Sequence, residues 1–575
     1  MIPGFVMAVR QRGWWWTLVG LLVLACASSH AIDLKEYLEE RAMLLAQEQT
    51  TIMGQEQVLS ADEQAVNKEL MLNKMREMDK SFETHDFPPS KNFMSVRHEI
   101  EASDVFKMIQ QMPKGAALHL HDTAMASSSW VVEEISYWPN LYMCYTKDDQ
   151  LLTMFFETPD TTCDWQLMSE VRESYPSADE FDQELLSRLS ILTDNPDEKY
   201  PDLNSVWSAF QGVFIAITGM LMYRPAWESY LYRAHQEFAH DNVLYIEFRG
   251  TLPLLYELNG TMLTEIESAA VYRDTAKRFL DNHPDQFFGT RYIYAPPRLV
   301  DNATMEGYVA LVRELRAQFP DFVAGFDLVG QEDLGNPLID FLAYLLPLHD
   351  AQVPVFYHSG ETAWMGTSTD ENLVDALLLN ATRIGHGYAI TKHPEAKQLA
   401  IEKDVPLEIC PISNQVLKLV ADLRNHPAAG LVAEGFPVVV SSDDPGFWGA
   451  VGISHDFYEA FMALGGAKAD LRFLKQLAIN SIMYSTLDEE AKSALMLKWV
   501  EKWDEFIATT NRLNSCTSKK FYPAVTTRVL TAVLGKKLRT THQTAQYEYC
   551  SLLTAKSKTP GHTSFRCRTK DLAGV

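Results

Sequence analysis

The chain has 575 residues, of which 47% are hydrophobic and 22% charged, a composition that excludes a disordered, collagen-like or wholly membrane-embedded protein. Lys and Arg total 50 against 76 Asp and Glu, and the resulting net charge of −26 argues against general affinity for nucleic acid or anionic membranes. The charge is uneven, because residues 514–575 contain 11 Lys and Arg but only 2 Asp and Glu.

Residues 1–31 have the pattern of a secretory signal peptide. Two arginines precede the apolar run 14–27, and Ser29 and Ala31 place small residues at −3 and −1 of a cleavage site. A retained membrane anchor is disfavoured, because the apolar run is shorter than the roughly 20 residues that a membrane span needs. We therefore predict a secreted, extracellular protein that begins near Ile32 and has no membrane span.

Residues 33–82 are rich in Glu, Gln, Lys, Leu and Met, with apolar residues in partly helical spacing and almost no Gly or Pro. This pattern predicts a helical segment that ends at Pro88 and Pro89, within an N-terminal arm spanning residues 32–95. The apolar stripe has two interpretations: the helix packs on its own domain, or it packs on a second subunit.

From residue 116 onward, short apolar runs alternate with longer helix-like stretches, which indicates parallel strands joined by helical crossovers. Eight candidate strands are Ala116–His121, Leu244–Arg249, Phe287–Ala295, Phe322–Val329, Val353–His358, Arg383–His386, Pro406–Cys410 and Phe436–Ser441. Eight β/α units predict an α/β protein of the (β/α)8 TIM-barrel type, formed by residues 96–126 and 200–512. Residues 127–199 are too long for a connection and are interpreted as an inserted subdomain.

Six cysteines remain after removal of the signal peptide. Cys144 and Cys163 have a separation that a disulfide closes readily in an oxidising compartment, whereas Cys410 lies in an apolar run and is predicted to be buried and free. The pairing of Cys516, Cys550 and Cys567, in the basic tail, is left open. Predicted glycosylation sites are the N-x-T sequons at Asn259, Asn302 and Asn380.

The first predicted strand ends in His119-Leu120-His121, so both imidazoles lie on the same side of the strand. This spacing alone is a weak signal, because two histidines two residues apart arise by chance. Further candidates follow other strands: His358 and Glu361 after the fifth, His386 after the sixth, and Asp443 and Asp444 after the eighth. A barrel brings these strand ends together at one mouth.

Three imidazoles and a carboxylate form a ligand set suited to one zinc ion with an open position for water. Such an ion activates water as a nucleophile at neutral pH. Glu361 is then placed to move protons, and His386 to orient the attacking hydroxide. Asp444 is placed to accept a hydrogen bond from a heteroaromatic N–H, and the whole set predicts hydrolytic deamination.

Four segments resemble the motif set of the adenosine deaminases. They are Met112-Pro113-Lys114-Gly115-Ala116-Ala117-Leu118-His119-Leu120-His121, His358-Ser359-Gly360-Glu361, Arg383-Ile384-Gly385-His386-Gly387 and Ser441-Ser442-Asp443-Asp444-Pro445. The signal peptide, the helical arm, the cysteine-bearing insertion and the extension Glu361-Thr362-Ala363-Trp364 resemble the extracellular branch of that family, the adenosine deaminase-related growth factors. The resemblance covers about residues 33–512 and fades in the tail.

This resemblance implies one zinc ion per chain, bound by His119, His121, His358 and Asp443, with Glu361 as proton shuttle and His386 as the hydroxide-orienting base. It also implies that Asp444 and the Gly330 backbone contact the purine, and that Asp122, Trp207 and Trp364 line the nucleoside site, although either Trp could equally be a core residue. In this branch the arm is associated with homodimers, and the insertion with receptor or glycan contacts.

The leading hypothesis is therefore a secreted zinc enzyme that converts adenosine, and 2′-deoxyadenosine, to inosine or deoxyinosine and ammonia. The alternative is an extracellular signalling protein, such as a growth factor, that acts by binding a receptor or a glycosaminoglycan independently of catalysis. Editing deaminases are disfavoured because their H-x-E and P-C-x-x-C signatures do not accompany the site, and an AMP deaminase needs a basic phosphate pocket. The basic tail, residues 513–575, is predicted to be disordered, with glycan binding as the other interpretation.

Overall fold

The computed structural model describes residues 33–520, with side chains through residue 513. The predicted signal peptide, Cys550, Cys567 and the side chain of Cys516 lie outside this part of the chain. None of the helices in the described part is long and apolar enough to cross a membrane.

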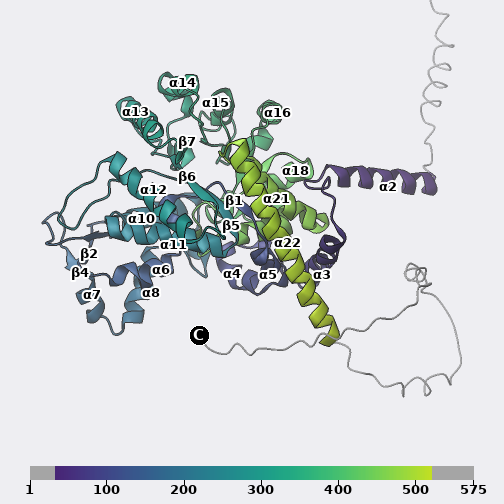
Figure 1. Cartoon of the computed structure of the whole chain (residues 1–575), viewed down its shortest axis with the longest axis horizontal. Coiled ribbons are helices and arrows are strands. Elements are labelled where there is room, and N and C mark those ends of the chain that lie inside the picture. Colours follow the sequence, from purple (N-terminus) through teal and green to yellow (C-terminus); the bar gives the residue numbers. More distant parts are fainter. Residues whose placement is uncertain (1–32, 521–575) are drawn as a thin grey trace, which may run out of the picture. The chain divides into compact units, whose positions relative to one another are not determined.

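Eight parallel strands form two four-stranded sheets, in the orders β1-β5-β6-β7 and β11-β10-β9-β8. The strands of the first sheet are labelled in Figure 1. The strands are β1 (Gly115–Ala117), β5 (Val243–Gly250), β6 (Gly289–Tyr294), β7 (Val323–Phe326), β8 (His358–Ser359), β9 (Ile384–His386), β10 (Leu407–Ile409) and β11 (Val438–Val440). Each overlaps one predicted strand, so an α/β protein with parallel sheets is confirmed.

Isolated parallel bridges connect the edges of the two sheets. Leu120, after β1, pairs with Asp443, after β11, and Phe326 of β7 pairs with Val355, which precedes β8. The carboxyl ends of β1 and β11 are therefore neighbours, although more than 300 residues separate them along the chain. This pairing brings together the chemistry-bearing residues that follow the strands.

Helices follow the strands and account for most of the remaining chain (Figure 1). Those before the first strand are α2 (Leu34–Thr51), α3 (Ala61–Thr84), α4 (Phe93–Ala102) and α5 (Asp104–Gln111). Those after residue 200 are α10 (Leu203–Leu221), α11 (Arg224–His240), α12 (Glu265–Asn282), α13 (Asn302–Gln318), α14 (Leu342–Asp350), α15 (Asn372–Leu378), α16 (Pro394–Glu402), α17 (Pro411–Val416), α18 (Ala428–Ala433), α19 (Pro445–Trp448), α20 (Ser454–Glu459), α21 (Leu471–Met483) and α22 (Glu489–Lys520).

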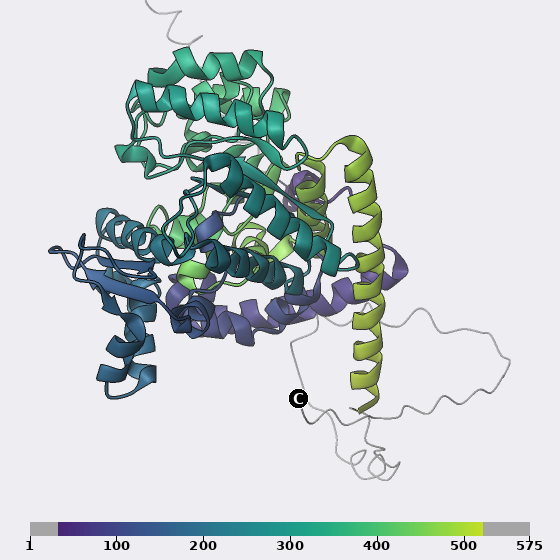
Figure 2. The ribbon, with the colours of Figure 1, turned by 60° about the vertical axis from the view of Figure 1, so that its left-hand side comes forward.

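The segment between β1 and α10 contains an antiparallel sheet in the order β3-β2-β4 (Figure 2). Its elements are α6 (Ser128–Glu133), β2 (Leu141–Tyr145), β3 (Leu151–Phe155), β4 (Gln166–Leu167), α7 (Met168–Ser174), α8 (Ala178–Arg188) and α9 (Pro196–Lys199). The predicted Cys144–Cys163 disulfide is confirmed, with an S–S distance of 2.07 Å, and Cys410 is buried and free as predicted.

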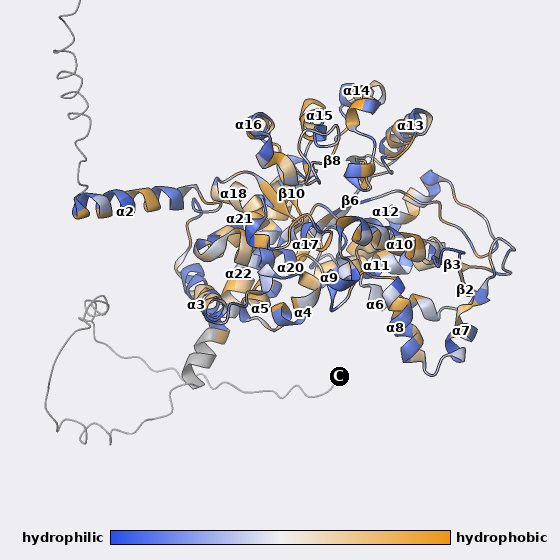
Figure 3. Cartoon of the chain, turned by 180° about the vertical axis from the view of Figure 1, so that it is seen from behind, coloured by the Kyte–Doolittle hydropathy of each residue, from blue (hydrophilic) through white to orange (hydrophobic). Residues whose placement is uncertain are grey.

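The predicted helical segment before the first strand consists of two helices that pack differently. A capping box between Ser60 and Glu63 starts α3, which buries Val66 and Leu70 against the rest of the chain. In contrast, α2 has no buried residue, although Leu34 and Leu38 are apolar (Figure 3). Thus α3 packs on its own chain, and the choice between the two interpretations stays open only for α2.

Candidate functional site

Side chains after four strands converge on one point. His119 follows β1, His358 lies in β8, His386 ends β9 and Asp443 follows β11, and ligand atoms of these four residues lie within 4.8 Å of one another. His121 forms a second, overlapping group with Asp443 and Asp444. The structure therefore brings together all four predicted ligands, but the distances alone do not separate His121 from His386.

This cluster has the properties of a cation site. The His119 Nε2 and Asp443 Oδ1 atoms are buried and make no hydrogen bond, although they lie 3.3 Å apart, and His121 Nε2 is 3.0 Å from the same oxygen. Leaving buried polar atoms unpaired is unfavourable, and a cation bound between them would satisfy both. Imidazole nitrogens with one carboxylate oxygen suit zinc, so the residues present fit the predicted ion.

Two further carboxylates orient the imidazoles. Glu408 Oε2 accepts a hydrogen bond from His119 Nδ1 at 2.6 Å, and Asp327 Oδ2 accepts one from His358 Nδ1 at 2.7 Å. With the proton on Nδ1, each ring presents the unprotonated Nε2 that a metal ion requires. Burial also lowers the pKa of His358 to about 4, so that this ring is neutral.

These carboxylates belong to a buried network of ion pairs. Arg249 lies 2.7 Å from both Asp327 and Glu408, and Arg383 lies 2.6 Å from Glu408 and 2.8 Å from Glu247. Although burial opposes ionisation, Arg249 and Arg383 hold the pKa of Glu408 well below its usual range. The network fixes the two carboxylates in the charged, accepting state that orients the histidines.

Glu361 is held beside this cluster by its backbone. Glu332 accepts hydrogen bonds from the N–H of Gly360 at 3.0 Å and from that of Glu361 at 2.6 Å. Burial, with the charges of Asp443 and Glu332, raises the pKa of Glu361 well above its ordinary value. The raised pKa favours the protonated form of this carboxyl group, whose Oε1 lies 3.6 Å from His386 Nε2.

Two of these residues have a left-handed backbone. His386 has φ 59° and Asp443 has φ 60°, values that are uncommon for residues other than Gly, although Asp and His adopt them more often than most. Such strain persists where the surrounding structure enforces it, commonly in functional sites. Gly387, also at φ 59°, continues the turn, and a Cβ there would contact Leu407 at 2.5 Å.

A cavity of about 320 Å³ opens over the cluster. Its lining includes the predicted residues His121, Asp122, Trp207, Gly330, His358, Glu361, His386, Asp443 and Asp444, together with apolar side chains such as Phe210 and Leu417. Burial raises the pKa of Asp122 to about 7, and burial with the Asp443 charge raises that of Asp444 well above its ordinary value. Trp364 is not brought into this cavity: it is 64% exposed, and Lys392 holds its backbone carbonyl at the surface.

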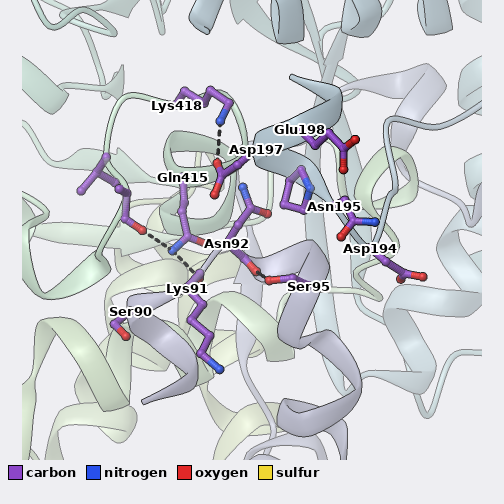
Figure 4. A pocket seen from close by; sticks show the side chains of 13 residues that line it. Ser90, Lys91, Asn92, Ser95, Asp194, Asn195, Asp197, Glu198, Gln415 and Lys418 are labelled. Atoms are coloured by element: carbon purple, nitrogen blue, oxygen red, sulfur yellow. Dashed lines mark hydrogen bonds and ion pairs between the residues drawn. The ribbon is translucent and has the colours of Figure 1, made fainter. Parts of the chain in front are cut away.

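A second cavity, of about 740 Å³, lies between α4, α9 and α17 (Figure 4). None of the predicted site residues lines it. Lys418 in its wall is paired with Asp197 at 2.9 Å, and Gln415 donates to the carbonyls of Lys91 and Ala421 (Figure 4). This cavity therefore has the character of a solvated surface hollow, in contrast to the site at the strand ends.

Sequence reasoning missed the residues that support the site. Asp327, Glu408, Arg249 and Glu332 received no role, although the first three lie within predicted strands. A charged residue inside an apolar strand was the available signal, because burying a charge is costly unless it is paired. Glu332 gave no such signal, since it lies in a polar loop segment.

Comparisons with known proteins agree with this site. A family profile described as "Adenosine deaminase" matches residues 193–503, and one described as "Adenosine/AMP deaminase N-terminal" matches residues 16–109. "Adenosine deaminase 2" of Homo sapiens is 45% identical over 493 residues, covering 85% of this chain and 96% of that protein. "Adenosine deaminase" of Lutzomyia longipalpis is 42% identical over 506 residues, covering 86% and 98%.

Solved structures give a more distant likeness. The crystal structure of Arabidopsis ADAL complexed with GMP has a TM-score of 0.51 at 19% identity, covering 69% of this chain and 98% of that one. The Arabidopsis N6-mAMP deaminase MAPDA has the same TM-score at 18% identity, covering 69% and 99%. At these identities the likeness concerns the fold alone.

Proposed function

Because this chain belongs to the adenosine deaminase family, we propose that it is a zinc-dependent enzyme that hydrolyses adenosine and 2′-deoxyadenosine to inosine or deoxyinosine and ammonia. The observation that carries the proposal is the cluster of His119, His121, His358 and Asp443 beside Glu361, whose pKa is raised by burial. One zinc ion per chain would be held by these four residues and would supply an activated water as nucleophile.

The residues of the chain would handle the protons. Glu361 would donate its proton to N1 of the purine, then accept a proton from the attacking water and pass it to the leaving amino group. The raised pKa of Asp444 favours its protonated form, which would donate a hydrogen bond to an unprotonated ring nitrogen, whereas the charged form would accept one from a ring N–H. Gly330, Trp207 and Asp122 line the cavity that would hold the nucleoside.

The cavity favours a nucleoside over a nucleotide. Among the described residues that line it, none is Lys or Arg, whereas a 5′-phosphate would need a positive partner. The carboxyl groups in its lining, those of Asp122, Glu361, Asp443 and Asp444, would not attract a phosphate. We therefore propose adenosine rather than AMP as the substrate.

We also propose that the eight strands form one closed (β/α)8 barrel. The bridges between Leu120 and Asp443 and between Phe326 and Val355, at the two pairs of sheet edges, support it. The arm 32–95 and the insertion 127–199 would be appended to this barrel. The exposed apolar residues of α2 support a homodimer in which α2 packs on a second copy.

The proposed location is extracellular. The Cys144–Cys163 disulfide supports it, because disulfides persist in oxidising compartments. Asn259, Asn302 and Asn380 are exposed, as N-glycosylation requires. Removal of extracellular adenosine would itself act as a growth signal, and binding of a receptor or glycosaminoglycan is the alternative source of such a signal.

The absorbance of adenosine in the near ultraviolet tests the activity directly, because it falls on conversion to inosine. We expect turnover by wild type and none by Glu361→Ala, with about one zinc ion per chain in both proteins. Absence of turnover in a zinc-loaded wild type would contradict the proposal. In a cell-growth assay, activity of the same folded, zinc-loaded Glu361→Ala protein would assign signalling to binding rather than catalysis.

A further inference from the structure

His386 differs from its neighbours in the group that faces its Nδ1 atom. For His119 and His358 that group is a carboxylate, which accepts a hydrogen bond and leaves Nε2 unprotonated. For His386 it is the side-chain amide of Asn414, whose Nδ2 lies 3.3 Å from Nδ1. An amide nitrogen only donates, so Nδ1 of His386 is the acceptor and the ring proton is left to Nε2.

The orientation of the Asn414 amide is set by a second buried histidine. The backbone N–H of Ala428 donates to His426 Nδ1 at 3.0 Å, so the single proton of the neutral ring is on Nε2. Burial lowers the pKa of His426 to about 3, which keeps the ring neutral. His426 Nε2 then donates to Asn414 Oδ1 at 2.9 Å, and the NH₂ group of Asn414 is turned toward His386.

We infer that Asn414 and His426 are positioning residues that hold His386 as the Nε2–H tautomer, with no lone pair for a metal ion. The inference rests on the proposed deaminase function and refines it. His386 Nε2 lies 3.6 Å from Glu361 Oε1 and 3.7 Å from Asp443 Oδ2, so this nitrogen is on the side of the ring that is next to these two carboxyl groups. His386 thus donates a hydrogen bond to the attacking oxygen, and Glu361 alone accepts the proton of the water.

The tautomer can be read in the full-length, zinc-loaded protein labelled with ¹⁵N at histidine. We expect the resonances assigned to His386, by comparison with His386→Gln, to show a protonated Nε2 and an unprotonated Nδ1. A protonated Nδ1, or an Nε2 bound to zinc, would overturn the inference. This measurement needs no turnover, so a failure of the proposed activity would remain distinguishable from a failure of the inference.

Asn414→Asp reverses the polarity at the same position, because a carboxylate accepts where the amide donates. The His386 proton should then move to Nδ1, and kcat should fall about 100-fold, with KM and zinc content little changed. Asn480→Asp is the matched control: Asn480 is a buried residue of α21 that donates to Val438 at 2.9 Å, and its substitution should leave kcat unchanged.

A third variant covers the case in which Asn414→Asp does not fold. His426→Phe removes the group that orients the amide while filling most of the space of the imidazole. We expect both His386 tautomers in its ¹⁵N spectrum and a smaller fall in kcat than in Asn414→Asp. A fall in kcat with the wild-type tautomer retained, in either variant, would contradict the inference.

Discussion

The cavity at the strand ends and the cavity between α4, α9 and α17 differ in how their polar groups are satisfied. In the cavity between α4, α9 and α17, the charged side chains have partners or face solvent: Lys418 pairs with Asp197, whose side chain is 90% exposed. In the cavity at the strand ends, buried atoms such as His119 Nε2 and Asp443 Oδ1 make no hydrogen bond. The smaller cavity is therefore the one organised for a ligand, and volume alone would have selected the wrong one.

The largest expected effect of a single change is at Glu361. Glu361→Gln preserves the shape of the side chain but removes its ability to accept and pass on a proton. We expect kcat to fall by about 10³-fold, with zinc retained, in the adenosine absorbance assay. Comparable turnover in wild type and variant would show that Glu361 does not transfer the proton.

Asp327→Asn tests the carboxylate that backs His358. The variant amide can still accept from the backbone N–H of His358 but cannot also accept from its Nδ1. Zinc affinity, measured by competition with a chelator, should fall by about 10- to 100-fold. Asp241→Asn is the control. Asp241, just before β5, is a buried carboxylate paired with Lys114, just before β1, so this substitution should lower stability but leave the zinc affinity unchanged. Equal affinities in the two variants would contradict the role of Asp327.

Glu332→Gln tests the loop that carries Glu361. One of the two backbone N–H groups, of Gly360 or Glu361, would face an NH₂ group instead of an acceptor. We expect kcat to fall about tenfold with zinc content unchanged, and the pH dependence of kcat to shift to lower pH, because Glu332 helps to raise the pKa of Glu361. Asp333→Asn, which keeps an acceptor for the Thr362 hydroxyl and leaves both backbone N–H contacts intact, is the control for the fall in kcat; its pH dependence should shift less, because the Asp333 charge raises the pKa of Glu361 less than that of Glu332 does. If the pH dependence of kcat in Glu332→Gln were the same as in wild type, the charge of Glu332 would not be raising the pKa of Glu361.

The smallest effect is expected in the other cavity. Lys418→Met breaks the ion pair with Asp197, and exposed pairs contribute about 1 kcal/mol or less to stability. Adenosine turnover should remain within twofold of wild type. A large fall in kcat/KM would show that this cavity takes part in catalysis. It would contradict the conclusion that only the cavity at the strand ends is organised for a ligand.

The sequence predicted the strands and the convergence of the site well, because both depend on local signals. Alternating apolar runs mark the eight strands, and the short motifs around His119, His358, His386 and Asp443 lie where those strands end. Parallel pairing then brings together residues far apart in the chain. Trp364, assigned from resemblance rather than from a strand position, is the predicted residue that the structure leaves at the surface.

The supporting residues could not be predicted in the same way. The partners of Arg249 are Asp327, directly after β7, and Glu408 in β10, and the pairing of Glu332 with the Gly360–Glu361 backbone joins two loops. Such contacts depend on the path that the chain takes after each strand. That path is set by tertiary packing and cannot be predicted from the spacing of residues in the sequence. The left-handed backbone of His386 and Asp443 is likewise set by the surrounding structure, since only a small share of residues other than Gly adopt it.

Anomalous diffraction at the zinc edge, from crystals of the purified enzyme, tests the central claim most directly. We expect one zinc ion per chain at the strand ends, about 2.0–2.2 Å from nitrogen atoms of His119, His121 and His358 and an oxygen of Asp443. His386 should lie outside the coordination sphere, and the cavity between α4, α9 and α17 should contain no zinc. Zinc bound by His386, or no ion among these residues in a catalytically active crystal, would contradict the account.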